Sequence, residues 1–138
     1  MQQTGNSFFG AIVWSGIARA AKGYDQARRA LAQGEAFLRE PCLSHCHLNF
    51  YQGAIDVSLD ARAWDEALRY AAALERYVSA EPLPWATLMI ERARALAAVG
   101  SGNKSAALFA DLRRIRSEIE RAGIRSALPN VELALAAA

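Results

Sequence analysis

The sequence predicts an all-α fold, a right-handed α-solenoid of three helix hairpins followed by one further helix. Two observations support this prediction. Apolar residues recur at intervals of three and four, as on one face of a helix, and related segments recur forty residues apart. The β-branched residues form no alternating run, so we expect no strand. The 138 residues suit a single domain. Its expected parts are hairpins at about 7–41, 43–82 and 84–123 and a final helix at about 129–137.

The repeat is clearest where the second helix of each hairpin begins. Residues 22–27 (KGYDQA) resemble residues 62–67 (RAWDEA), and residues 102–107 (GNKSAA) are a weaker third copy. The last alanines of these segments, at positions 27, 67 and 107, lie forty residues apart. A unit of this size buries its apolar face only by stacking on a neighbour, so the repeat predicts a solenoid.

Each repeat contributes a less polar first helix and an amphipathic second helix. The sequence predicts first helices over 8–21, 43–59 and 85–99. It predicts second helices over about 24–38, 64–78 and 108–123. Gly123 is typical of a helix end. Prolines follow the three second helices, at positions 41, 82 and 129. The final helix is expected to have no partner within the chain.

The composition excludes several classes of function. Hydrophobic residues make up 53% and charged residues 22%, as in soluble globular proteins. The net charge of +2 is too small for a protein that neutralises phosphates, so we expect no nucleic-acid partner. The charge-free stretch 8–18 is too short to span a bilayer, and no basic residue precedes it, so we expect neither membrane insertion nor export. The only cysteines, Cys42 and Cys46, suit a reducing compartment, and we expect a cytoplasmic protein.

One dense cluster of reactive side chains contains Cys42, His45, Cys46 and His47. On a helix the two cysteines share a face and, with one histidine, offer three ligands to zinc. The alternative is a pair of small buried cysteines beside a histidine near a helix N-terminus. Neighbouring residues on a helix diverge by about 100°, so neither histidine is placed to activate Cys46 as a nucleophile. We expect no metal, no cofactor and no catalytic residue.

A second charged stretch places Glu118 and Glu120 among several arginines, at positions 113, 114, 116, 121 and 125. This spacing is typical of a solvated helix face with ion pairs. A nucleic-acid site is not favoured there, because no aromatic residue is available to stack on bases.

The segment Ala-Trp-Asp-Glu-Ala-Leu (63–68), followed by a helix and a proline, resembles the inter-helix turn and second helix of a tetratricopeptide repeat. The resemblance implies that Ala67 is the small residue where two helices cross and that Tyr51 is the large aromatic residue of the first helix. It places Ala54, Ile55 and Ser58 at packing positions. The third copy departs from this pattern, with charged residues at the aromatic and packing positions, Glu91 and Arg94. The period also exceeds the usual value of about 34 residues.

Residues 34–45, 64–75 and 80–85 resemble the C-terminal helical-repeat region of bacterial signalling proteins that join an adenylate or guanylate cyclase domain to an ATPase module. The resemblance covers about 27–133. In that family the cyclase and nucleotide sites lie in other domains. This chain also has no Gly-x-x-x-x-Gly-Lys-Ser/Thr phosphate loop, so the resemblance implies a regulatory context without either activity.

We therefore expect a non-catalytic scaffold that binds a peptide or a partner domain in its concave groove. In tetratricopeptide-like folds the first helix of each hairpin lines the groove. On this basis we assign six residues to it: Arg19, Asn49, Gln52, Asp56, Met89 and Arg92. The alternative is self-assembly, in which the terminal helices stack on a second copy to form a homodimer. That alternative depends on apolar residues near each end of the chain: Phe8, Phe9, Ile12, Trp14, Val131, Leu133 and Leu135.

Overall fold

A computed structural model describes residues 10–39 and 44–138 of the chain. Helices occupy most of these residues, and no strand occurs among them, which confirms the all-α class. The helices are α1 (Gly10–Ala20), α2 (Tyr24–Phe37), α3 (Ser44–Asp60), α4 (Trp64–Tyr77), α5 (Pro84–Gly100), α6 (Ala106–Ala122), the short 3-10 helix η1 (Arg125–Ala127) and α7 (Leu128–Ala136). The chain divides into two compact units, Met1–Val57 and Ser58–Ala138, and α3 contributes to both.

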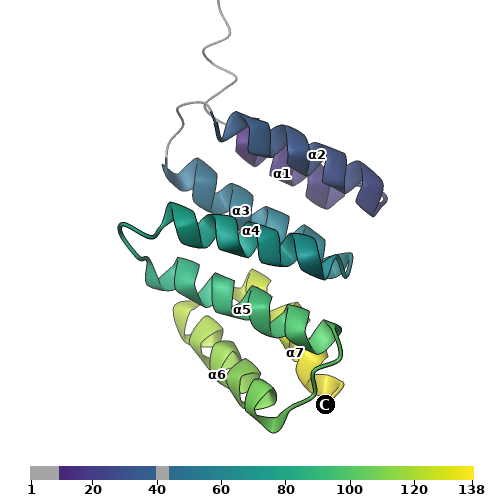
Figure 1. The fold of residues 1–138 in the computed structure, drawn as a ribbon, viewed down its shortest axis with the longest axis vertical. Helices are drawn as coiled ribbons and strands as arrows, with labels where there is room; N and C mark the ends of the chain where they lie inside the picture. Colours follow the sequence, from purple (N-terminus) through teal and green to yellow (C-terminus); the bar gives the residue numbers. More distant parts are fainter. Residues whose placement is uncertain (1–9, 40–43) are drawn as a thin grey trace, which may run out of the picture. The chain divides into compact units, whose positions relative to one another are not determined.

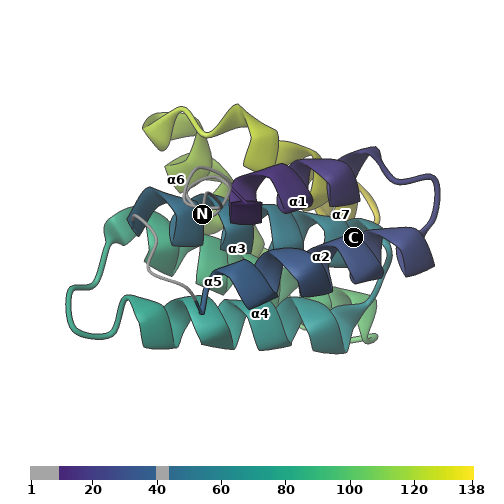
Figure 2. The same ribbon diagram turned by 90° about the horizontal axis from the view of Figure 1, so that it is seen from above.

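In the first unit, α1 and α2 form a hairpin and lie against each other along their length (Figure 2). The hairpin is built with small residues at its close contacts. At Gly34 on α2, an added Cβ would lie 2.5 Å from a ring carbon of Phe50 on α3 and 3.0 Å from the Cβ of Trp14. Phe50 is buried. The absence of a side chain at position 34 therefore makes room for the Phe50 ring.

In the second unit, α5 lies at the centre and contacts α4, α6 and α7 (Figure 1). Its buried residues occur on several faces, as expected for a helix with neighbours on more than one side. The helices around it contribute one apolar face each. The main buried side chains of these helices are Tyr70, Leu74, Leu112, Ile115, Ile119 and Val131.

The turns after α3 and α5 have the same backbone geometry, forty residues apart. Arg62 has a φ of 56° and Gly102 a φ of 101°, both in the left-handed region. The next residue donates its N–H to a carbonyl five residues back in both turns, from Ala63 to Ser58 (2.8 Å) and from Asn103 to Ala98 (3.0 Å). This is the hydrogen-bonding pattern of a helix C-cap that favours glycine. Gly123 ends α6 in the same conformation, as predicted, with a φ of 73°.

The repeat of forty residues is maintained in α2 and α4 but is displaced in α6. The buried positions of α2 (27, 30, 31 and 34) recur in α4 as 67, 70, 71 and 74. Forty residues later, positions 107, 110, 111 and 114 are all exposed, and α6 instead buries Phe109, Leu112, Ile115 and Ile119. The alignment of the third copy on Ala107 is therefore wrong.

The displacement has a local cause in the turn that precedes α6. The side chain of Asn103 accepts a hydrogen bond from the N–H of Ser105 (3.0 Å), and Ser105 then caps α6 by accepting from the N–H of Leu108 (3.3 Å). The two ordered side chains lengthen the turn, so α6 begins at Ala106 and not at residue 104. A shift of this kind moves the buried face of the helix to other residues.

The prediction that the last helix has no partner in the chain is also wrong. α7 contacts both α5 and α6. Val131 of α7 is fully buried, and Asn130 donates from its side-chain amide to Asp60 at the end of α3 (3.0 Å). None of the helices in the described part of the chain is both long and apolar enough to cross a membrane.

Candidate functional site

Four of the six predicted groove residues lie in the first unit, and the structure brings two of them together. The guanidinium of Arg19 on α1 donates to the carboxylate of Asp56 on α3 (3.1 Å). Asn49 and Gln52 lie seven and four positions before Asp56, on the same face of α3. Asn49 is exposed and donates to the carbonyl of His45 (2.9 Å), whereas Gln52 and Asp56 are half-buried. These residues form a polar surface, and its binding role stays a prediction.

The other two predicted groove residues, Met89 and Arg92, are both 1% exposed, so assigning them to a binding surface is wrong. The physical reason is the position of η1 and α7. The Nε of Arg92 donates to the carbonyl oxygen of Ala127, the last residue of η1 (2.9 Å). Because α7 packs against α5 and η1 accepts this hydrogen bond, this face of α5 belongs to the core of the second unit.

Two hollows lie on the surface of the second unit, on either side of one stretch of α5. The α4–α5 hollow has a volume of about 310 Å³ and a floor that includes Val78 and Ile90. The α5–α6 hollow has a volume of about 320 Å³ and a floor of Ala95, Leu108 and Ile115. Glu91 and Arg94 line both hollows. These are the residues at which the sequence departs from the tetratricopeptide pattern.

An exposed ion pair closes one side of the α4–α5 hollow. Both terminal nitrogens of Arg94 on α5 donate to the two carboxylate oxygens of Glu75 on α4, at 3.1 and 2.6 Å. Such a two-point pairing has a defined geometry, unlike most surface ion pairs. The hydrogen bonds and the charge of Arg94 lower the pKa of Glu75 below its ordinary value of 4.5. Glu75 is therefore a carboxylate at neutral pH.

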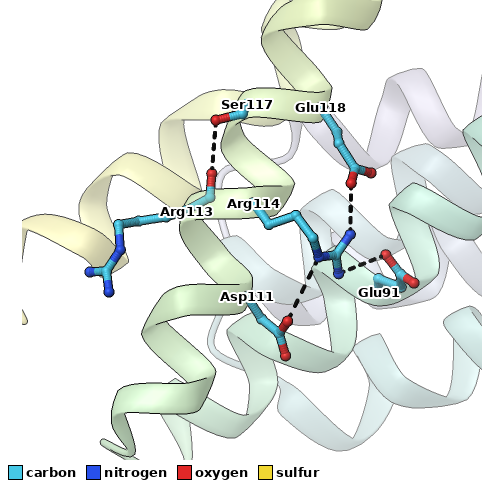
Figure 3. A network of polar contacts seen from close by, with 6 residues as sticks. All are labelled: Glu91, Asp111, Arg113, Arg114, Ser117 and Glu118. Carbon is cyan, nitrogen blue, oxygen red and sulfur yellow. Dashed lines mark hydrogen bonds and ion pairs between the residues drawn. The ribbon is translucent and has the colours of Figure 1, made fainter.

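A second arginine, Arg114 on α6, lines the α5–α6 hollow. Its guanidinium contacts the carboxylates of Glu118 (2.9 Å), Glu91 (3.1 Å) and Asp111 (3.7 Å) (Figure 3). The hydrogen bond to Glu118 is the main cause that raises the pKa of Arg114. Figure 3 also shows that the side chain of Arg113 points away from this network. The contact to Glu91 ties α6 to α5 at the edge of the hollow.

These hollows and their rims form the ion-paired surface of the second unit. Its charged residues are the lining residues Glu75, Glu91, Arg94, Asp111 and Arg114, together with Glu118, which lines neither hollow but pairs with Arg114. Four carboxylates and two guanidinium groups leave a formal charge of −2 on this surface. Apolar floors beside oriented charged groups are what a binding surface needs to hold an apolar side chain and select its neighbours.

The cluster of cysteines and histidines shows a different environment from this surface. Cys42 lies outside the described residues. Cys46 is buried in α3, and His47 is half-buried beside Tyr51, with ring centroids 6.5 Å apart. Burial lowers the pKa of His47. Across 10–39 and 44–138, no three side chains of His, Cys, Asp or Glu lie close enough together to hold a metal ion.

None of the residues of the ion-paired surface is among the predicted site residues, although the sequence carries two signals for them. The first is the pair of charged residues at positions 91 and 94, where the pattern expects an aromatic and a packing residue. The second is the charged stretch of α6, in which the expected helix-spaced ion pairs occur between Arg114 and both Asp111 and Glu118. The pairing of Glu75 with Arg94 required the structure, because the two residues lie on different helices.

Searches against protein-family models, curated proteins and solved structures found no match for this chain.

Proposed function

We propose that the chain is a non-catalytic protein-binding scaffold, a right-handed solenoid of tetratricopeptide-like hairpins that acts in bacterial signalling in the cytoplasm. The spacing of the helices supports the repeat architecture. α3 and α5 have the same length and begin forty residues apart, at Ser44 and Pro84. α2 and α4 also begin forty residues apart, at Tyr24 and Trp64. Repeated first and second helices are the unit from which solenoids are built.

The observation that carries a binding role is the ion-paired surface of the second unit. At the position of α5 that corresponds to the packing residue Ala54 of α3, the chain has Arg94. The surface around Arg94 has two hollows with apolar floors. An apolar side chain of a partner gains free energy when it leaves water for such a hollow. The ion pairs at the rim fix its orientation, because charged groups contribute more to specificity than to affinity.

This proposal is tested by selecting peptides from a random display library on the immobilised chain. We expect binding peptides to be enriched. A selected peptide should then lose most of its affinity for Thr87→Trp, in which an indole at an exposed lining position fills the α4–α5 hollow. The control is Ala110→Trp, an exposed position of α6 that lines neither hollow.

Failure to enrich any peptide would contradict the proposed function. Equal loss of binding in Thr87→Trp and Ala110→Trp would contradict the assignment of the binding to the hollows. Circular dichroism of both variants identifies any change in folding.

Self-assembly is a second candidate, favoured by an exposed apolar stripe on α1. Val13 is 55% and Ile17 42% exposed, and the small residues Gly16 and Ala20 are exposed on the same face. In α7, Leu133 is 70% exposed, whereas Val131 is buried within the chain. Ile12 and Trp14 are half-buried, and so is Leu135. Phe8 and Phe9 lie outside the described residues.

The two candidates are separated by light scattering over a range of protein concentrations. A homodimer through α1 should dissociate when Val13 and Ile17 are both changed to Lys, because each exposed apolar contact becomes a charged one. A monomer at every concentration would eliminate self-assembly.

A further inference from the structure

We propose that the ion-paired surface takes a basic segment of a partner protein, in which Lys or Arg residues alternate with apolar residues. This inference deepens the proposed function and rests on it. It assigns the chemical class of the ligand from the charge and shape of the surface. Three features of the surface support this assignment: the two arginines are paired, the carboxylates are in surplus, and the hollows have apolar floors.

The two arginines are already paired, so neither is a ready site for an anion. Arg94 donates from two nitrogens to Glu75, and Arg114 lies within 3.7 Å of carboxylate oxygens from three residues. An acidic ligand would have to displace these carboxylates and would also be repelled by them. The arginines hold the carboxylates in place and offset part of their mutual repulsion.

The carboxylates exceed the guanidinium groups by two, which gives the surface its formal charge of −2. The whole chain has a net charge of +2, so this local excess of acid does not follow from the overall composition. Side-chain exposures of 41% for Glu91 and 62% for Asp111 show that these groups remain accessible to a ligand. A carboxylate has room for more than one hydrogen bond, so a paired one still accepts from a Lys or Arg of a partner.

The apolar floors require that the basic segment also carries apolar side chains. Ile90 lies under the α4–α5 hollow, and Leu108 and Ile115 lie under the α5–α6 hollow. Glu91 and Arg94 each line both hollows, and Arg94 is already paired with Glu75. A ligand that fills both hollows must therefore place apolar groups on either side of a carboxylate. A polypeptide with alternating apolar and cationic residues meets this requirement.

Two labelled peptides test the inference by fluorescence anisotropy with the full chain. In the first, leucine alternates with a Lys-Gly pair, and in the second glutamate replaces every lysine. We expect the lysine peptide to bind and the glutamate peptide to bind at least roughly tenfold more weakly. Added salt should lower the affinity for the lysine peptide, because salt screens the exposed carboxylates that bind it.

Variants identify the carboxylates that act. The double substitution Glu75→Gln and Glu91→Gln keeps the shape of both side chains. It should lower the affinity for the lysine peptide roughly five- to tenfold, since each exposed ion pair contributes a few-fold to the affinity. Glu120→Gln is the matched control, because Glu120 is an exposed acid of α6 that lines neither hollow. It should bind as the unchanged chain does.

The outcomes separate this inference from the proposed function. If library peptides bind in the hollows but are not basic, or if the double variant keeps full affinity, the inference fails and the scaffold remains. If no library peptide binds at all, the proposed function fails as well. A dimer of the chain that dissociates in the double variant would assign the hollows to a second copy and overturn the inference.

Discussion

α3 and α5 are counterparts in the repeat, and the differences between them explain where the second unit has the surface that we propose for binding. Both helices contain 17 residues, and their ends lie forty residues apart. When α3 is shifted by forty residues onto α5, five buried positions coincide, which shows that the two helices share a packing pattern. The coinciding pairs are Cys46 and Ala86, Phe50 and Ile90, Gly53 and Ala93, Ile55 and Ala95, and Val57 and Ala97.

The helices differ at the remaining positions in two opposite ways. Ala54 is buried, whereas its counterpart Arg94 is exposed and lines both hollows. Gln52 is half-buried, whereas its counterpart Arg92 is buried under η1. The shared positions therefore maintain the fold. The differing positions either open the surface or extend the core, and a repeat pattern alone does not tell which.

The largest effect is expected where the core is extended. Arg92→Ala should lower the free energy of unfolding by about 3 kcal/mol, because it leaves a cavity and removes the donor to the Ala127 carbonyl. Gln52→Ala, at the counterpart position, should cost less than about 1 kcal/mol. Denaturant unfolding followed by circular dichroism measures both values.

Arg92→Met separates the two causes, because it restores most of the volume without a donor. We expect it to recover part of the loss only. Equal costs for Arg92→Ala and Gln52→Ala would show that α7 does not seal this face of α5.

A second pair of counterpart positions differs in how side-chain volume is divided between two helices. In the first unit Gly34 lies against the ring of Phe50. The counterparts of these residues in the second unit are Leu74 and Ile90, two buried residues of intermediate size. Gly34→Ala should destabilise the chain by about 2 kcal/mol, since the new Cβ overlaps the ring of Phe50.

The double variant Gly34→Ala with Phe50→Leu should be more stable than the sum of the two single effects predicts, by about 1 kcal/mol. The double-mutant cycle is measured by thermal unfolding. Strictly additive effects would show that the two positions do not compensate each other.

The turns after α3 and α5 provide a third comparison, with a smaller effect. Arg62→Gly should stabilise the chain by roughly 0.5 to 1 kcal/mol, because a left-handed backbone strains a residue that has a Cβ. The reverse change in the other turn, Gly102→Arg, should destabilise it by a similar amount. A loss of stability in Arg62→Gly would show that the Arg62 side chain makes a contribution larger than the strain.

Local patterns in the sequence predicted the helices well, because each helix is defined by its own apolar face and end signals. The prediction of α6 ended at Gly123, where the structure also ends it. The position of α7 could not be predicted in this way. Its packing depends on Val131 meeting α5 and α6, and on Arg92 finding a carbonyl 35 residues further along the chain.

The candidate site was predictable only in part, for the same physical reason. Pairs within one helix, such as Arg114 with Glu118, follow from their spacing of four residues. The pair of Glu75 and Arg94 joins two helices, and its geometry depends on how they pack. The exposure of Met89 and Arg92 was also predicted wrongly, because the repeat pattern places both residues on the surface and does not include α7, which packs against α5.

The smallest effect is expected from Arg94→Ala, which gives α5 the residue that α3 has at position 54. Arg94 lowers the pKa of Glu75, so near the ordinary value of 4.5 the folded chain binds fewer protons at this carboxyl than the unfolded chain does. The ion pair therefore contributes stability above that pH, and the contribution is lost as the pH falls. The melting temperature of Arg94→Ala should lie slightly below that of the unchanged chain at pH 7, and the two should converge as the pH falls below 4.5 and through the lowered pKa of Glu75.

Thermal unfolding across this pH range, with the exposed Arg28→Ala on α2 as a control, measures the effect. Arg28→Ala should show no such convergence. A difference between Arg94→Ala and the unchanged chain that is the same at every pH would mean that the stem of Arg94 stabilises α5 by packing. In that case α5 would differ from α3 in the size of its side chains, and the ion pair would contribute to ligand selection alone.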